Sequence, residues 1–347
     1  MSEAQDRIGV EVRTVGAPDE GLRLDRWFRA HFPSLGHGAL ERMLRKGQVR
    51  VDGAKAKASQ RVSAGQEVRI PPDVPRSAEG SGDPARKAAG VGRISRKEAA
   101  ETLSAWTIYE DDAILAINKP FGLAVQGGTK TTRHVDALLE ALRPDGERPR
   151  LVHRLDRDTG GVLLLAKSRR DAAALGRSLQ ERDVEKTYWA LTVRAPRPRE
   201  GRIDLPIAKR GGEAPDAAGE RMEPAQGRDA KKALTDFQTV EQAGQGPAFL
   251  ALRPITGRTH QLRVHCAAVG APIVGDGKYG GPEARLEGVA RKLHLFCRSM
   301  RFRHPRGGGF MELTAPLTGH MAETWAFFGF PNDVELEWPL IDAPRAG

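Results

Sequence analysis

A dense run of charged residues precedes a strongly apolar stretch near the middle of the chain. Residues 153–161 read HRLDRDTGG and lead directly into the apolar residues 162–166. Asp156 and Asp158 offer carboxylates that can serve as a nucleophile or as a general base, and Arg154 stands close to them in the chain. Charged groups beside a buried strand need partners or a function. This segment is therefore the first candidate for a catalytic site.

Three other interpretations of this segment differ in how well they fit. A calcium-binding EF-hand loop counted from Asp156 fails, because Gly160 stands at an acidic position and Lys167 stands where the terminal Glu is required. A two-carboxylate glycosidase is disfavoured, since alternate residues of one turn are poorly placed to flank a sugar. A salt-bridged turn, in which Arg154 and Arg157 neutralise the acids, stays open on this segment alone.

A second polar cluster, GRTHQLRVH, occupies residues 257–265. His260 and His265 are not arranged as in the His-Glu-x-x-His zinc helix, because no Glu follows the first histidine. Residues 270–275 have the spacing of a phosphate-binding loop, but Asp276 stands where that loop requires Lys. The sequence therefore predicts neither a metal site nor a bound nucleotide cofactor.

Two further segments complete a set of four. Residues 185–190 read EKTYWA and place Tyr188, one of only 3 tyrosines, on a predicted strand. Residues 115–123 read LAINKPFGL, a predicted strand that ends in a Pro and Gly turn. In this order the four segments resemble the RluA-type family of pseudouridine synthases, over roughly residues 106–330. The resemblance implies an isomerase that converts uridine to pseudouridine in RNA.

The resemblance also implies a role for each candidate residue. Asp156 is the essential carboxylate, and Arg263 is the guanidinium that keeps it charged. Tyr188 stacks on the uracil, and Arg154 takes the place that the uracil leaves when it flips out of the RNA. His153 is expected to orient the turn. In this reaction the bond between ribose and uracil moves from nitrogen 1 to carbon 5 of the base. Nothing is oxidised, so no cofactor and no metal are required.

Two other functions stay open beside this prediction. The chain could be a non-catalytic RNA-binding factor of ribosome assembly, or a synthase directed at transfer RNA. A nucleoside glycosylase is disfavoured, because no second carboxylate is placed to activate water. An RNA-binding module placed before such a domain resembles the branch of the family that modifies large-subunit (23S-type) ribosomal RNA, so the resemblance implies this target.

That module is predicted from residues 21–70, in the order helix, basic helix, strand, Asp-Gly turn and strand. The pattern resembles the alpha-L RNA-binding module named after the fourth small-subunit ribosomal protein. Between positions 22 and 76 the chain carries twelve Lys and Arg residues and five acidic residues, a net charge of +7. Such clustering is typical of a phosphate-binding surface. The predicted RNA-binding side chains are Arg42, Arg45, Lys46 and Arg50.

The elements that must position the catalytic motifs form an α+β fold with a mixed, largely antiparallel sheet and flanking helices. Gly160 and Gly161 permit a tight turn that would hold Asp156 at the edge of a cleft. Residues 209–232, polar and rich in glycine, are expected to be an exposed loop. Strands are predicted at residues 114–118, 162–166, 187–193, 234–240 and 249–252, and helices at 95–103, 135–142, 171–180 and 259–269.

Composition places this chain among basic proteins that handle nucleic acid. The net charge is +10 and the sequence pI is about 9.8, and no stretch approaches ~20 consecutive apolar residues. We expect a cytoplasmic monomer whose partner is RNA. The predicted organisation is an N-terminal tail (1–20), the RNA-binding module (21–76), a linker (77–104), the catalytic domain (105–335) and a C-terminal tail (336–347).

Overall fold

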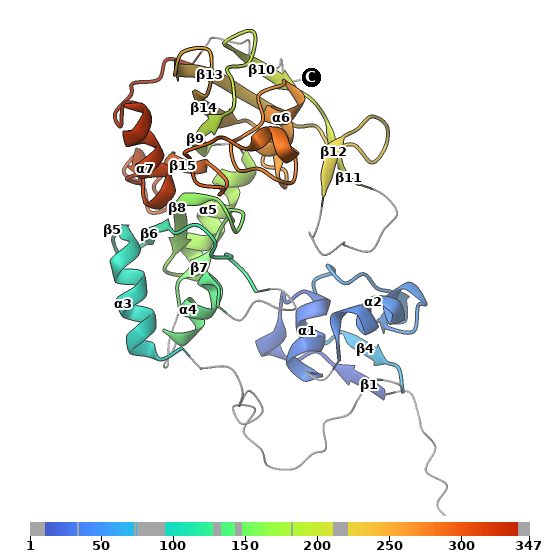
Figure 1. The fold of residues 1–347 in the computed structure, drawn as a ribbon. Helices are drawn as coiled ribbons and strands as arrows, with labels where there is room; N and C mark the ends of the chain where they lie inside the picture. The colour runs from blue at the N-terminus through green and yellow to red at the C-terminus, as the bar shows by residue number, and fades with distance from the viewer. Residues whose placement is uncertain are drawn as a thin grey trace, which may run out of the picture. The chain divides into compact units, whose positions relative to one another are not determined.

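The computed structural model divides the chain into two compact units, Met1–Ala89 and Gly90–Gly347 (Figure 1). Within the described residues, no helix is both long enough and apolar enough to cross a membrane. The structure describes residues 11–32, 35–72, 74, 94–127, 133–142, 148–181, 183–210 and 221–338.

The first unit packs two short helices against a four-stranded sheet of order β1-β4-β2-β3. Trp27 and Phe28 of the first helix are fully buried in its core, and strand β4 alternates exposed and buried side chains, as a half-buried strand does. Strand β1 falls inside the segment predicted as an N-terminal tail. The bounds are β1 (Glu11–Thr14), α1 (Leu24–His31), α2 (His37–Arg45), β2 (Arg50–Val51), β3 (Ala54–Lys55) and β4 (Glu67–Ile70).

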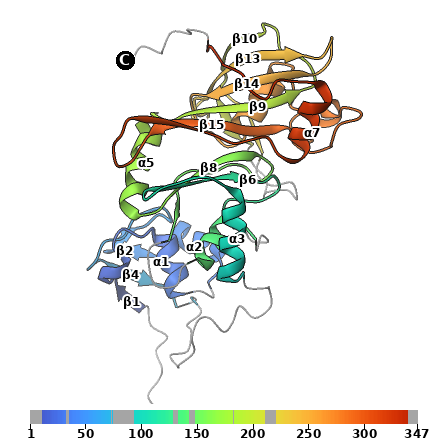
Figure 2. The same cartoon turned by 90° about the vertical axis from the view of Figure 1, so that its left-hand side faces the viewer.

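The second unit is built on one large sheet of order β10-β13-β14-β9-β15-β8-β6-β5, and Figure 2 shows its strands from β6 to β10. Neighbouring strands are antiparallel except β8 and β15, which are parallel. The predicted mixed, largely antiparallel sheet is confirmed. The bounds are β5 (Thr107–Glu110), β6 (Ile114–Lys119), β8 (Gly160–Ala166), β9 (Glu185–Thr192), β10 (Glu200–Asp204), β13 (Leu234–Gln242), β14 (Ala248–Pro254) and β15 (Leu295–Arg303).

Helix α7 covers one face of this sheet at β9 and β14. Because the side chains of β9 alternate between the two faces, every second one lies on the opposite face, where there is a cavity. The ring of Trp325 in α7 stacks on Trp189 of β9 at 6.0 Å and meets the edge of Phe249 at 4.9 Å. Since neighbouring strand residues point to opposite faces, Lys186 and Tyr188 lie on the face away from α7. The other helices are α3 (Arg96–Trp106), α4 (Val135–Ala141), α5 (Arg169–Glu181) and α6 (Gln261–Ala268), and α7 spans Gly319–Phe328.

Helix α3 lies where a helix was predicted at 95–103, and its Ala99 and Leu103 are buried in the core of the second unit, although this stretch also belongs to the predicted linker. One segment differs in part from its predicted character. In the predicted loop 209–232, β12 (Met222–Pro224) pairs with β11 (Ile207–Lys209), and the side chain of Met222 is buried. Residues 211–220 of that loop lie outside the described residues. Helix α3 and strand β12 have few apolar side chains, but these side chains are buried by tertiary packing. Composition alone does not reveal such packing.

Candidate active site

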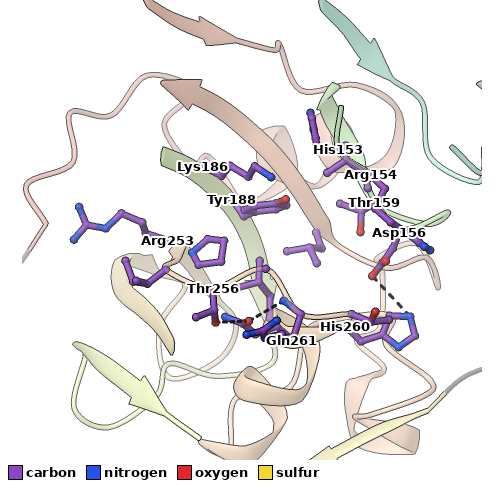
Figure 3. A pocket seen from close by; sticks show the side chains of 18 of the residues that line it. His153, Arg154, Asp156, Thr159, Lys186, Tyr188, Arg253, Thr256, His260 and Gln261 are labelled. Carbon is purple, nitrogen blue, oxygen red and sulfur yellow. Dashed lines mark hydrogen bonds and ion pairs between the residues drawn. The ribbon is translucent and has the colours of Figure 1, made fainter. Parts of the chain in front are cut away.

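One cavity of about 590 Å³ in the second unit gathers the sequence motifs (Figure 3). Its walls come from the segment before β8, from the start of β9, and from the connection between β14 and α6. The structure therefore brings together the predicted catalytic residues Asp156, Tyr188 and Arg263, with Arg154 also on the lining.

The glycine pair after the charged motif allows two strands to approach closely. Gly161 has a φ of 107°, and a Cβ there would lie 2.1 Å from the carbonyl oxygen of Cys297 on β15. A Cβ on Gly160 would lie 2.9 Å from the ring of Phe121. The pair is required for the parallel contact of β8 with β15, beyond the turn that the sequence indicated. The Asp156 segment is fixed at the cavity by this contact.

His153 orients the same segment from within the protein. Its Nε2 accepts a hydrogen bond from the backbone N–H of Leu164 at 2.9 Å, which requires the neutral ring. Burial, assisted by the charge of Lys186, lowers the pKa of His153 well below its usual 6.5. The expected orienting role agrees with this geometry.

Lys119 is a buried cation that the motif analysis did not single out. Its ammonium donates to the carbonyl oxygens of Pro120 at 2.9 Å, Leu123 at 2.8 Å and Arg157 at 3.2 Å. Burial lowers its pKa to about 8. Lys119 thus ties the turn after β6 to the Asp156 segment. A lysine ending an apolar strand just before Pro and Gly is the sequence signal that could have indicated it.

Asp156 has a neighbour, His260, that the sequence analysis did not assign. The Nε2 of His260 lies 3.8 Å from Oδ2 of Asp156, and the Asp156 side chain keeps 25% of its surface exposed to the cavity. His260 holds a left-handed backbone conformation with φ 54°, which is strained for a residue other than glycine. Such strain persists only where the surrounding contacts fix it, and here it aims the ring at the carboxylate.

Tyr279 sets which nitrogen of His260 faces Asp156. The Tyr279 oxygen accepts the N–H of Met222 at 3.0 Å and lies 2.7 Å from Nδ1 of His260. This hydrogen bond holds Nδ1 of His260 and leaves Nε2 on the side of the ring that faces Asp156. Burial lowers the pKa of His260 below 6.5, against an opposing effect from the charge of Asp156. The histidine is therefore neutral at neutral pH.

Arg263 has a different direct partner from the predicted one. Its Nε and its terminal nitrogen contact the two oxygens of Asp276 at 2.8 and 2.7 Å, so the fork of the guanidinium binds Asp276 and not Asp156. Burial alone would lower the pKa of Arg263, but Asp276 and the charge of Asp156 raise it above its usual value. Arg263 acts on Asp156 through its charge, while Asp276 and the ring of Tyr279, 5.0 Å away, hold it in place.

Tyr188 closes the inner end of the cavity. Its side chain is buried, and burial with its hydrogen bond to Cys297 raises its pKa well above 10. The charge of Asp156 adds to this rise, which places the two side chains within electrostatic reach. The phenol is therefore neutral, and its side chain forms part of the cavity lining.

The predicted RNA-binding residues of the first unit lie apart from these motifs in the chain. Arg42, Arg45 and Lys46 are exposed at the C-terminal end of α2, and Arg50 begins β2. The guanidinium of Arg50 donates to the carbonyl oxygens of Gly47 and Gly53, which fixes its direction. Across the described ranges of both units, no group of three or more His, Cys, Asp or Glu side chains is arranged to hold a metal ion.

Comparison with known proteins agrees with the fold and the cavity. The family model described as RNA pseudouridylate synthase matches residues 113–268. Ribosomal large subunit pseudouridine synthase C of Salmonella typhimurium is 36% identical over 313 residues, covering 89% of this chain and 93% of that protein. The Escherichia coli K12 protein of the same name is 36% identical over 314 residues, with the same coverage.

The solved structure of human RNA Pseudouridylate Synthase Domain Containing 4 superposes with a TM-score of 0.55 and 27% identity, covering 67% of this chain and 96% of that one. The chain therefore belongs to the RNA pseudouridine synthases, isomerases that convert uridine to pseudouridine. The family predicted from the motifs is confirmed.

Proposed function

We propose that this enzyme modifies uridines of large-subunit ribosomal RNA in the cytoplasm. The observation that carries the proposal is 36% identity, over 89% of the chain, to proteins named ribosomal large subunit pseudouridine synthase C. The match covers 93% of those relatives, so both units take part in it. A transfer RNA target is the second candidate, and the experiment below separates the two.

Asp156 is the essential carboxylate in this proposal. It stands at a cavity wall, faces the neutral His260 at 3.8 Å and keeps a quarter of its side chain exposed, so a carboxylate oxygen can meet a ribose or a base. The guanidinium of Arg263 interacts with Asp156 through its charge. The ionised carboxylate can then attack or take a proton, as the reaction requires.

Tyr188 and Arg154 receive the flipped nucleotide. A uracil must leave its stack before reaction, at a cost of a few kcal/mol. The neutral ring of Tyr188 gives it a new surface on which to stack, and the exposed Arg154 at the rim can occupy the vacated position in the RNA. The bound RNA must also exclude water from the cavity, because water would otherwise hydrolyse the separated sugar.

The first unit supplies affinity as an alpha-L RNA-binding module. Its two helices, its short sheet and the Asp52–Gly53 turn follow the order predicted for that module, and the exposed cations of α2 fit phosphate groups. Arg42, Arg45, Lys46 and Arg50 are the proposed RNA contacts. We propose that the enzyme acts as a monomer and without a cofactor or metal, because isomerisation imports no group.

The test is incubation of the purified enzyme with unmodified large-subunit ribosomal RNA and, separately, with unmodified transfer RNA. The buffer contains a chelator and no nucleotide, under conditions that keep the RNA folded. Pseudouridine, released uracil and unchanged uridine are then counted and mapped. Pseudouridine at a few positions of the ribosomal RNA alone is expected. Modification of transfer RNA instead would overturn the substrate assignment, and bound RNA with no change would indicate a non-catalytic assembly factor.

A further inference from the structure

Lys186 places an ammonium in the wall of the cavity without an anionic partner. It lies two positions before Tyr188 on β9, so both side chains leave the strand on the face opposite Trp189. Both line the cavity, and Figure 3 shows them reaching into it from the same strand. Among the described residues, the structure gives the Lys186 ammonium neither an ion pair nor a hydrogen bond.

The groups around this ammonium are all neutral. Burial raises the pKa of the Cys297 thiol to about 12, against the opposing charge of Lys186. The ring of His153 is neutral, because it accepts the N–H of Leu164, and the phenol of Tyr188 keeps its proton. Burial also lowers the pKa of Lys186 itself. A partly buried cation without a counter-charge is costly, and the cost falls when a ligand brings an acceptor to it.

We infer that Lys186 binds a carbonyl oxygen of the flipped uracil. The inference rests on the proposed function, in which the uracil stacks on Tyr188. The charge of Asp156 affects Tyr188, His260 and Arg263, whereas the groups that interact with Lys186 are His153 and Cys297. In this inference Asp156 faces the ribose end of the nucleotide and Lys186 faces the edge of the base.

The chemistry of the reaction makes this contact stronger as the base separates. When the bond between uracil N1 and ribose C1′ breaks, its electron pair goes to the uracil and spreads over the two carbonyl oxygens. The base then bonds to C1′ through C5, and the proton lost from C5 is balanced by one gained at N1. An ammonium at a carbonyl oxygen stabilises the separated uracil more than the bound uridine.

A phosphate group is the other anionic feature of RNA that could meet Lys186, and a base-free RNA separates the two. The experiment uses Lys186→Met and Lys186→Arg with two RNAs that contain a mapped target. One RNA carries uridine there, and the other carries the same ribose without a base. Affinity is measured over a range of salt concentrations, and kcat and KM are measured on the uridine RNA.

The expected result is a loss of kcat of about 10- to 100-fold in Lys186→Met, the range for removing a buried charged hydrogen bond. Its affinity should fall for the uridine RNA and stay unchanged for the base-free RNA, with an unchanged salt slope. Lys186→Arg should recover part of kcat because it keeps the charge. Lys167→Met is the matched control, since Lys167 pairs with Glu110 at 2.9 Å outside the cavity lining, and it should behave as the wild type.

Two results would overturn the inference. Equal affinity losses on both RNAs, with a salt slope reduced by roughly 0.7–0.9 units, would assign Lys186 to a phosphate. A lower melting temperature in Lys186→Met with unchanged kcat would make it a structural residue. If the wild-type enzyme forms no pseudouridine on the same RNA, the proposed substrate fails instead, and the binding comparison still reports on Lys186.

Discussion

The cations of α2 in the first unit are exposed, whereas several of the most important charges in the second unit are buried in pairs. Asp236 is fully buried between Arg202 at 2.6 Å and Arg253 at 2.9 Å, and Asp276 is bound by Arg263. Exposed charges act over a Debye length and are screened by salt, but buried pairs hardly respond to salt and depend on geometry. The exposed charges of the first unit are therefore suited to attracting a charged partner, whereas the buried pairs of the second unit hold side chains in position.

The largest expected effect is on turnover and comes from replacing Asp156 in the second unit. Asp156→Asn keeps the shape of the side chain but removes its ability to attack or to take a proton. We expect turnover to fall by about 10²- to 10⁴-fold, measured as pseudouridine formed per enzyme, with RNA affinity and its salt slope retained.

Asp158→Asn is the matched control for this change. Asp158 is exposed, and its carboxylate lies 3.7 Å from Nε of Arg157, outside the cavity lining. Clear activity is expected for it. Equal loss of activity in both variants, with the fold intact, would contradict the assignment of a single essential carboxylate.

The second prediction tests how rigidly the second unit holds the Asp156 segment. Gly161→Ala forces a Cβ to within 2.1 Å of the Cys297 carbonyl at a φ of 107°, so β8 and β15 must separate. We expect a loss of about 3 kcal/mol or more in the free energy of unfolding, measured by urea denaturation.

Gly176→Ala gives the control in the same unit. Gly176 lies within α5, and a Cβ there meets nothing within 4 Å. Alanine in a helix interior should stabilise by about 0.5–1 kcal/mol. A similar loss in both glycine variants would show that the close approach of β8 and β15 is not the reason for Gly161.

The third prediction is a loss of stability of the second unit in mild acid. Burial, together with the charge of His320, lowers the pKa of His294 to about 4, and the ring is fully buried. The unfolded chain takes up a proton near pH 6.5 and the folded one does not. Stability is therefore full above pH 6.5 and falls as the pH decreases toward 4, by about 2 kcal/mol at pH 5 from this residue.

His294→Asn identifies this contribution, because asparagine does not titrate in the range. The variant should be less stable at pH 7.5 but should lose about 2 kcal/mol less than the wild type between pH 7.5 and pH 5. His153, His260, His265 and His320 have lowered pKa values from burial as well, so a residual decrease is expected. An unchanged pH dependence in His294→Asn would refute the assignment.

The sequence was sufficient to predict the residues of the cavity that sit in short contiguous motifs. Asp156 precedes a strand and Tyr188 lies on one, and both strands can be recognised from their apolar pattern. The position of each residue relative to the sheet could therefore be predicted. The α+β class followed in the same way from the order of strands and helices. The fold class was predicted from local pattern and composition, whereas the roles of Asp156 and Tyr188 were predicted from the resemblance of their motifs to those of a known family.

Contacts between distant segments could not be predicted, because they depend on how the strands approach. The tie of Lys119 to the carbonyl of Arg157 and the bond between His260 and Tyr279 join separate segments of the folded chain. The direct contact of Arg263 with Asp276 could not be predicted for this reason, since the turn carrying Asp276 folds back beside α6, while the charge of Arg263 still interacts with Asp156. The pairing of buried charges is decided by tertiary structure and not by spacing.

The smallest expected effect on turnover tests the other side of the comparison. Replacing Arg42, Arg45 and Lys46 with Glu reverses three exposed charges at the end of α2, and none of these residues has an ion-pair partner among the described carboxylates. If each contacts a phosphate, the slope of log affinity against log salt should decrease by about 2–3 units. At saturating RNA, kcat should stay within about twofold of the wild type, because the cavity residues all belong to the second unit.

Replacing the same three residues with Gln separates the loss of positive charge from repulsion by the new carboxylates, and it should give a similar slope with a smaller loss of affinity. A wild-type salt slope in both variants would mean that α2 contacts something other than RNA, and the exposed charge of the first unit would then serve a different partner.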